Sequence, residues 1–181
     1  MNDAVFGWLA VFLGFVILQR VSELVVSARN ARRVMARGGK EYGAGHFPWL
    51  VCVHVLFIAG IAAEVLFLGT RPGALWPLWL AVWAGAQLLR YAAVRALGER
   101  WNVRIIVVPG MPLVRTGPYR RLRHPNYVAI VAEMISAPLI FGAWRTALIV
   151  SLLNALALRT RIRVENEALR AAQADASGAS R

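Results

Sequence analysis

Long apolar stretches, separated by short polar or arginine-rich segments, take up most of this chain of 181 residues. A helix of about 20 apolar residues crosses the hydrocarbon core of a bilayer, which is about 30 Å thick. Hydrophobic residues make up 59% of the chain, above the roughly 45–50% that is usual for a soluble domain. We therefore predict an all-α fold, an integral membrane helical bundle with about five transmembrane helices.

The predicted elements form one domain, residues 1–170, followed by a disordered tail of small and polar residues at 171–181. Gly142 and Arg145 interrupt the last apolar stretch, so its two arms are expected to form a hairpin. The five helices are predicted at about 4–28, 47–69, 74–94, 126–141 and 145–169, with the main loops at 29–46 and 95–125.

Basic residues are distributed unevenly along the chain. Of 21 lysines and arginines, 17 fall in the loops 29–46 and 95–125 or after residue 158, whereas Arg71 and Arg145 lie at the opposite turns. Because positively charged loops stay in the cytoplasm, we predict an N-terminus outside, with both loops and the C-terminus in the cytoplasm. The net charge of +12 then reflects membrane topology, and no nucleic-acid partner is predicted.

Few ionisable or reactive side chains lie within the apolar stretches. Cys52 is the only cysteine, so neither a disulfide nor a cysteine-based metal site is expected, and no metal is predicted. Ionisable groups are costly in hydrocarbon and are therefore candidates for function; here they are His54, Glu64 and Glu133. The alternative is that they form hydrogen bonds between helices, with Arg20 or Arg90 as partners.

A polar stretch from Met111 to Tyr127 lies at the entrance to the fourth predicted helix. Pro125 suits the first turn of that helix, where the missing N–H of proline costs nothing. Arg123 and His124 would suit an anion at this place, since the helix N-terminus adds its own positive charge. The alternative is a belt of arginine and tyrosine that holds the helix at the lipid head groups.

A second polar stretch follows the last apolar segment. Arg161 and Glu165 stand four residues apart, as do Arg163 and Glu167, so each pair lies along one face of a helix. Taken alone, this pattern is also typical of a solvated helix end whose charges pair with one another.

Together, the two stretches resemble the isoprenylcysteine carboxyl methyltransferase and phospholipid methyltransferase group of membrane enzymes. That group carries a Gly-x-Tyr element, an Arg-His-Pro-x-Tyr element that enters a helix, and an Arg and a Glu four residues apart after the last hydrophobic segment. The corresponding elements here are Gly117 to Tyr119, Arg123 to Tyr127, and Arg161 with Glu165. Two positions depart from the group's pattern, because Ala129 replaces a glycine and Asn166 replaces a glutamate.

The resemblance implies S-adenosylmethionine as the cofactor and a role for each matching residue. Arg161 would be the catalytic residue and would face the methyl acceptor. The cofactor contacts would be Arg104, Met111, Pro112, Leu113, Val114, Tyr119, His124, Pro125, Asn126, Tyr127 and Glu165.

The residue types favour methylation of an oxygen. An acceptor that is already anionic needs little base catalysis, and an arginine would orient its oxyanion by hydrogen bonds but repel an ammonium group. The segments Gln19 to Leu24, Ala28 to Asn30 and Glu41 to Pro48 resemble a bacterial branch of the group, the alkylpyrone O-methyltransferases associated with type III polyketide synthases. The predicted acceptor is therefore a lipophilic alkyl-4-hydroxypyrone, and the alternative is the carboxylate of a prenylated cysteine.

This interpretation places the chain among the lipids of the bacterial cytoplasmic membrane, with its active site facing the cytoplasm. A function of another class stays open, in which the basic loops of a non-catalytic membrane protein bind anionic lipid head groups. That alternative explains the charge but not the combined motifs. The sequence predicts no particular oligomeric state.

Overall fold

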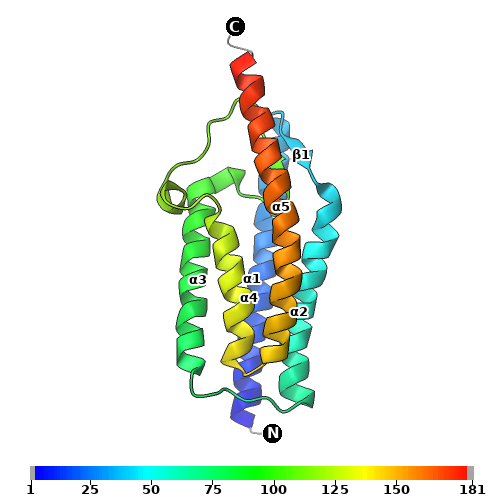
Figure 1. The fold of residues 1–181 in the computed structure, drawn as a ribbon, viewed down its shortest axis with the longest axis vertical. Helices are drawn as coiled ribbons and strands as arrows, with labels where there is room; N and C mark the ends of the chain where they lie inside the picture. The colour runs from blue at the N-terminus through cyan, green and yellow to red at the C-terminus, as the bar shows by residue number, and fades with distance from the viewer. Residues whose placement is uncertain (1–2, 179–181) are drawn as a thin grey trace.

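The fold is a bundle of five α-helices that run alternately up and down, as the computed structural model shows (Figure 1). The structure describes residues 3–178. Its two chain ends lie at opposite ends of the bundle. The predicted all-α class and the predicted number of helices are confirmed. The helices are α1 (Asp3–Ala36), α2 (Phe47–Phe67), α3 (Trp76–Leu97), α4 (Pro125–Ile140) and α5 (Trp144–Gly178).

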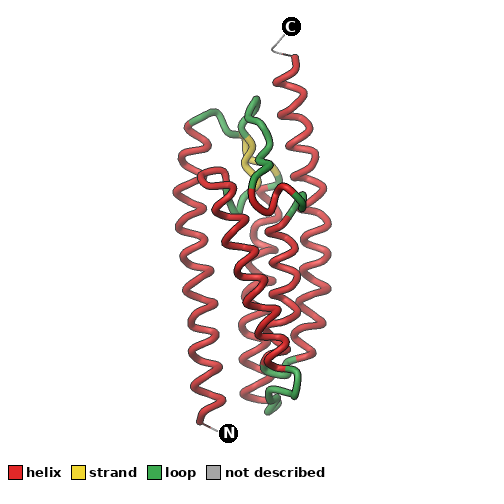
Figure 2. The backbone as a smooth tube through the Cα atoms, turned by 90° about the vertical axis from the view of Figure 1, so that its left-hand side faces the viewer, coloured by secondary structure: helices red, strands yellow, loops and turns green. Residues whose placement is uncertain are grey.

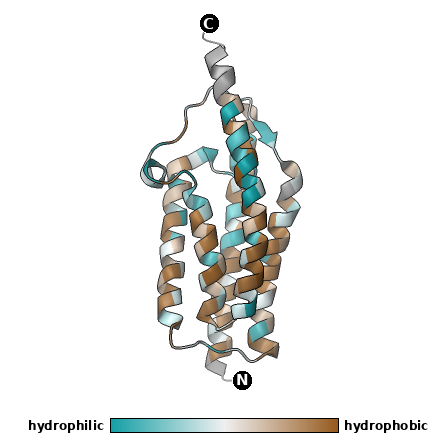
Figure 3. Ribbon diagram, viewed as in Figure 1, coloured by the Kyte–Doolittle hydropathy of each residue, from teal (hydrophilic) through white to brown (hydrophobic). Residues whose placement is uncertain are grey.

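Two of the helices are long and apolar enough to cross a bilayer: α1, over Val5–Ala36, and α2. Helix α4 is apolar but has 16 residues, which gives it a length of about 24 Å. Hydrophobic residues cover the lower part of the bundle, whereas hydrophilic residues gather on the upper part of α5 and on the adjoining strand (Figure 3). The bundle therefore has one polar end, and the five-span topology stays a prediction.

Two helices extend further than predicted at this polar end. The first helix continues past residue 28 and ends at Ala36. Gly38 follows two residues later with a φ of 81°, which suits glycine. The predicted disordered tail is wrong for residues 171–178, because α5 runs on to Gly178. That segment is rich in alanine, the best helix former. Residues 179–181 of the predicted tail lie outside the described residues.

A short β-ribbon joins the two loops at the polar end (Figure 2). Strand β1 (Lys40–Tyr42) pairs antiparallel with β2 (Ile105–Val107), with Glu41 opposite Ile106. Three 3₁₀ turns lie nearby: η1 (Ala44–His46), η2 (Gly98–Arg100) and η3 (Gly117–Arg120). The sequence predicts loops here, because three-residue strands leave no periodic signal.

The apolar core lies inside the bundle, between the helices. Phe12 of α1 contacts the ring of Phe141 at a centroid distance of 5.2 Å, and Phe57, Ile61 and Met134 are completely buried around them. The turn between α4 and α5 requires Gly142, which has a φ of +72° and a backbone so close to Arg71 that a Cβ atom would collide with it. The predicted hairpin of the last two helices is therefore closed tightly.

Charged side chains are buried at mid-height in the bundle and neutralise one another. We call Arg20, Glu23, Arg90 and Glu133 the interior cluster. Arg20 donates hydrogen bonds to both oxygens of Glu133, at 2.6 and 2.7 Å, and to Glu23, at 2.6 Å. Arg90 also donates to Glu133, and it lies 3.4 Å from Glu23. Glu133 is thus an interhelical partner of Arg20 and Arg90, as one of the two interpretations of the sequence predicts.

The other two ionisable residues of the apolar stretches also have hydrogen-bonding partners. Glu64 accepts hydrogen bonds from the backbone N–H of Thr146 and, at 2.6 Å, from its hydroxyl group, so it satisfies a free N–H at the start of α5. The Nδ1 atom of His54 lies 2.8 Å from the carbonyl oxygen of Leu50 in its own helix. These contacts favour a structural role for Glu64.

Candidate active site

Tyr127 is the centre of the polar cluster at the end of the bundle. It stands in the first turn of α4, after Pro125 at the helix start and His124 at the N-cap. Its hydroxyl group accepts a hydrogen bond from Nε of Arg161, at 2.8 Å, and donates one to the carboxylate of Glu165. The two motifs, 34 and 38 residues apart in the sequence, therefore meet at one phenol. We call Tyr127, Arg161 and Glu165 the site cluster.

Two more of the predicted residues lie next to this cluster. The ring of His124 stacks on that of Tyr127, with 5.2 Å between centroids and 17° between planes. Tyr119, in η3, is close enough to Glu165 to feel its charge: burial raises the pKa of the Tyr119 phenol, and the negative charge of Glu165 raises that pKa further. Tyr119 therefore stays protonated and keeps a hydrogen-bond donor beside the cluster.

The guanidinium group of Arg161 is held on two sides. Besides the bond from Nε to Tyr127, its Nη2 atom donates to the carbonyl oxygen of Val103, and the group lies 5.8 Å from the centroid of the Tyr127 ring. Among the described residues, Nη1 of Arg161 makes no hydrogen bond. An oriented arginine with a free donor group is suited to binding an oxyanion.

The charges of this helix segment do not pair with one another. Within residues 3–178 no ion pair joins Arg161 to Glu165 or Arg163 to Glu167. The interpretation of this segment as a self-paired helix end is therefore wrong, because Arg161 turns toward Val103 and Tyr127 instead. The hydroxyl group of Tyr127 separates Arg161 from Glu165.

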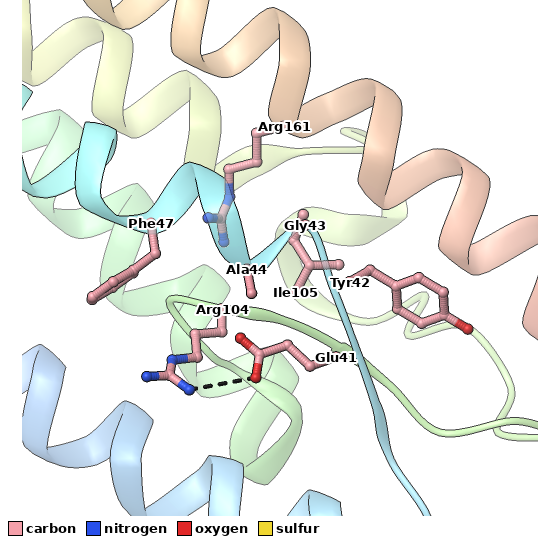
Figure 4. Close-up of a pocket in the computed structure, with 8 residues that line it drawn as sticks. All are labelled: Glu41, Tyr42, Gly43, Ala44, Phe47, Arg104, Ile105 and Arg161. Atoms are coloured by element: carbon pink, nitrogen blue, oxygen red, sulfur yellow. Dashed lines mark hydrogen bonds and ion pairs between the residues drawn. The ribbon is translucent and has the colours of Figure 1, made fainter.

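A small pocket opens on the other side of Arg161 (Figure 4). The side chain of Arg161 points from α5 toward Ala44, while Arg104 faces Glu41, at 3.4 Å, across the pocket. Arg104 also lies over the ring of Phe47, 5.5 Å from its centroid. The predicted residue Arg104 therefore shares a pocket with Arg161, whereas no hydrogen bond or ion pair joins it to Glu165 among the described residues.

The predicted run Met111, Pro112, Leu113 and Val114 lies in the loop between β2 and η3. The N–H of Gly110, just before it, donates to the carbonyl oxygen of Ala172 on α5, at 3.4 Å, and Arg100 donates to that of Pro112, at 2.6 Å. Within the described chain no hydrogen bond or ion pair joins this run to the site cluster. The structure thus brings these four residues to the polar end without a hydrogen bond to Tyr127 among the described residues.

Other residues contact Arg161 without being candidates in the sequence. No sequence motif indicates the carbonyl of Val103, because every residue has a backbone carbonyl. The pocket residues Glu41, Ala44 and Phe47 belong to a segment that resembles the bacterial branch, and this is the signal that would have pointed to them.

A helical membrane bundle with an arginine, a tyrosine and a carboxylate gathered at one polar end defines a membrane protein with an enzyme-like site. Residues 79–171 match the isoprenylcysteine carboxyl methyltransferase family. The chain belongs to this family, whose members are membrane-integral methyltransferases that use S-adenosylmethionine as methyl donor.

Relatives extend the similarity over almost the whole chain. The uncharacterized protein YpbQ of Bacillus subtilis is 38% identical over 162 residues, which are 90% of this chain and 95% of that protein. An uncharacterized protein of Haemophilus influenzae is 28% identical over 151 residues, 83% of this chain and 88% of that protein. No solved structure matches the chain.

Proposed function

We propose that this protein is an S-adenosylmethionine-dependent O-methyltransferase that acts on a lipophilic oxyanion at the cytoplasmic face of a bacterial membrane. The observation that carries the proposal is the meeting of Arg161 and Glu165 at the hydroxyl group of Tyr127. Methyl transfer requires chiefly that donor and acceptor be aligned and water excluded. Arg161 and Glu165 lie one helical turn apart on α5. The methyl acceptor at Arg161 and the methyl donor at Glu165 would therefore be adjacent.

The polar groups around Tyr127 fit the proposed cofactor. Asn126, in the same motif, has a buried Oδ1 atom with no hydrogen-bond partner among the described residues, and a buried acceptor without a partner is costly. Glu165 adds a second acceptor, and Tyr119 adds a donor. Amino and hydroxyl groups of S-adenosylmethionine would satisfy these acceptors, and the bound cofactor would supply an electrophilic methyl group.

Arg161 would bind the acceptor. Its Nη1 group makes no hydrogen bond to the part of the chain that the structure describes, whereas Nε and Nη2 are engaged by Tyr127 and Val103. The guanidinium group would therefore present its remaining N–H groups to an oxyanion and hold the attacking oxygen in line with the methyl group. The same positive charge disfavours the ammonium group of an amine lipid.

An apolar hollow beside Arg161 would take the tail of the acceptor. It is lined by α2 residues such as Trp49 and Leu50 and by Leu156, Ala157 and Thr160 of α5. The hollow and the pocket of Figure 4 are lined by neighbouring residues of the same two segments, since Gly45 and Thr160 line the hollow and Ala44 and Arg161 line the pocket. A long alkyl or prenyl chain would rest there between the helices while its polar head reaches Arg161.

Two acceptor classes suit these features. An alkyl-4-hydroxypyrone combines an acidic enol with an alkyl tail, and the segment from Glu41 to Phe47, which resembles the alkylpyrone branch, lines the pocket. The carboxylate of a prenylated cysteine is the second candidate, favoured by the family to which the chain belongs.

A comparison of acceptors with purified protein tests the proposal. With labelled S-adenosylmethionine, we expect the fastest methylation for an alkyl-4-hydroxypyrone, a slower rate for a farnesylcysteine analogue and the slowest for phosphatidylethanolamine. A clear preference for phosphatidylethanolamine would contradict the oxyanion mechanism. Absence of transfer to any lipophilic oxygen would contradict the proposed function as a whole.

A further inference from the structure

Two polar residues of α1 are buried against the segment that carries Val103. Ser27 and Asn30 lie one helical turn apart and are only 5% and 7% exposed. The hydroxyl oxygen of Ser27 accepts a hydrogen bond from the N–H of Val103, at 2.9 Å. The side-chain amide of Asn30 donates to the carbonyl oxygens of Trp101, at 2.8 Å, and Gly98, at 3.2 Å.

These bonds fix an irregular piece of backbone between α3 and β2. Residues 98–103 form a 3₁₀ turn and a bend, so few of their polar groups are satisfied by regular secondary structure. A buried backbone N–H or C=O without a partner costs about 1–3 kcal/mol. Trp101 is only 4% exposed, so the backbone around it has little access to water. The hydrogen bonds of Ser27 and Asn30 therefore stabilise this conformation.

Val103 links this segment to the site cluster. Its N–H is held by Ser27, and its carbonyl oxygen accepts the hydrogen bond from Nη2 of Arg161. A long arginine side chain has many rotamers in solution, and here only Val103 and Tyr127 hold it by hydrogen bonds among the described residues. The direction of the guanidinium group thus depends on where Ser27 and Asn30 hold the backbone.

We propose that Ser27 and Asn30 are positioning residues of the acceptor site, which act through Val103 to orient Arg161. The inference rests on the proposed function, because it takes Arg161 as the residue that binds the acceptor. Both residues lie on α1, outside the region 79–171 that matches the family. Helix α1 is therefore part of the site through the backbone that Ser27 and Asn30 hold.

The test compares two serine-to-alanine variants on the same helix. Ser27→Ala removes the acceptor of the Val103 N–H, whereas in Ser22→Ala the lost hydroxyl is exposed and bonds only to the carbonyl of Gln19 in its own helix, at 2.8 Å. With the best acceptor, we expect Ser27→Ala to lower kcat about tenfold and to raise the KM of the acceptor. The affinity for S-adenosylhomocysteine should change by less than about twofold, and Ser22→Ala should behave as wild type.

Three further variants separate positioning from a merely structural role. Ser27→Thr keeps a hydroxyl group and should restore most of the lost turnover, while Asn30→Ala should reproduce the pattern of Ser27→Ala. In an Arg161→Ala background, Ser27→Ala should cause almost no additional loss, because the residue through which it acts is gone.

Each outcome has a definite meaning. Equal kinetics of Ser27→Ala and Ser22→Ala, an additive loss in the Arg161→Ala background, or loss of S-adenosylhomocysteine binding in Ser27→Ala would overturn the positioning role alone. Failure of the wild-type protein to bind S-adenosylhomocysteine and to methylate any acceptor would overturn the proposed function and, with it, this inference.

Discussion

The charged groups of the interior cluster and those of the site cluster are paired in different ways. In the interior cluster, two arginines face two glutamates, and Glu133, which is fully buried, accepts hydrogen bonds from both Arg20 and Arg90. In the site cluster, Arg161 and Glu165 are kept apart by the hydroxyl group of Tyr127. The interior charges pair directly with one another, whereas a neutral hydroxyl group stands between the two charges of the site cluster.

This difference in pairing distinguishes charges that stabilise the fold from charges that serve the reaction more clearly than their burial does. Charges inside a membrane are costly, and direct pairing with good geometry offsets the cost. The interior cluster meets that condition and joins α1, α3 and α4. The site cluster lies at the polar end, where charges are less costly, and its groups are oriented by neighbours rather than neutralised by each other. Loss of a charge should therefore affect stability in the first case and turnover in the second.

The largest effect is expected for Glu133→Gln, which removes the shared carboxylate of the interior cluster and leaves Arg20 and Arg90 with Glu23 alone. Breaking a buried ion pair costs about 3–5 kcal/mol, so the apparent melting temperature in detergent should fall by several degrees. Glu64→Gln is the matched control, because its amide oxygen still accepts hydrogen bonds from Thr146, and it should lower the melting temperature less. Equal melting temperatures for both variants would contradict the stabilising role assigned to the interior cluster.

Arg161→Ala should come next, with a loss of turnover of at least about 100-fold, or about 2.7 kcal/mol, because the acceptor loses its oriented cation. Arg161→Lys keeps the charge but not the planar fork, so its turnover should lie between those of alanine and wild type. Arg163→Ala, on the exposed side of α5, should leave turnover unchanged. Normal turnover in Arg161→Ala would refute the oxyanion mechanism.

Tyr127→Phe should have a smaller effect, because it keeps the ring that stacks on His124 and removes only the hydroxyl group. Arg161 then loses an acceptor and Glu165 loses a donor, each bond being worth about 0.5–1.5 kcal/mol. We expect kcat to fall about three- to tenfold, whereas Tyr91→Phe, at an exposed position of α3, should be neutral. The kinetics of the two phenylalanine variants would be indistinguishable if the phenol did not orient the site.

The fold was accessible from the sequence because long apolar stretches dominate it. The boundaries of α2, α3 and α4 lie within three residues of the predicted ones. The polar ends are where prediction fails: α1 continues through Arg32 and α5 through Ala172, since arginine and alanine are good helix formers without being apolar. The β-ribbon was missed because its strands are three residues long.

The candidate site was accessible only in part. The motifs locate Tyr127, Arg161 and Glu165, since side chains with distinctive chemistry recur in a recognisable pattern. The contacts of Val103, Ser27 and Asn30 were not predicted, because a backbone carbonyl and small polar residues of a distant helix leave no spacing signal. Such contacts depend on how the loops between helices fold, which the apolar pattern does not determine.

The central claim, that the site cluster belongs to an S-adenosylmethionine-dependent enzyme, is tested most directly by calorimetric titration of the purified protein with S-adenosylhomocysteine. We predict saturable binding with one site per chain for wild type. In Glu165→Gln, affinity should be lower by about 1.5–3 kcal/mol, the value of one hydrogen bond to a charged group. Glu167→Gln should bind as wild type does, because Glu167 lies on the exposed side of α5, about 200° around the helix from Glu165. Absence of binding by a folded wild-type protein that still binds anionic lipid vesicles would contradict the claim and favour a non-catalytic lipid-binding role.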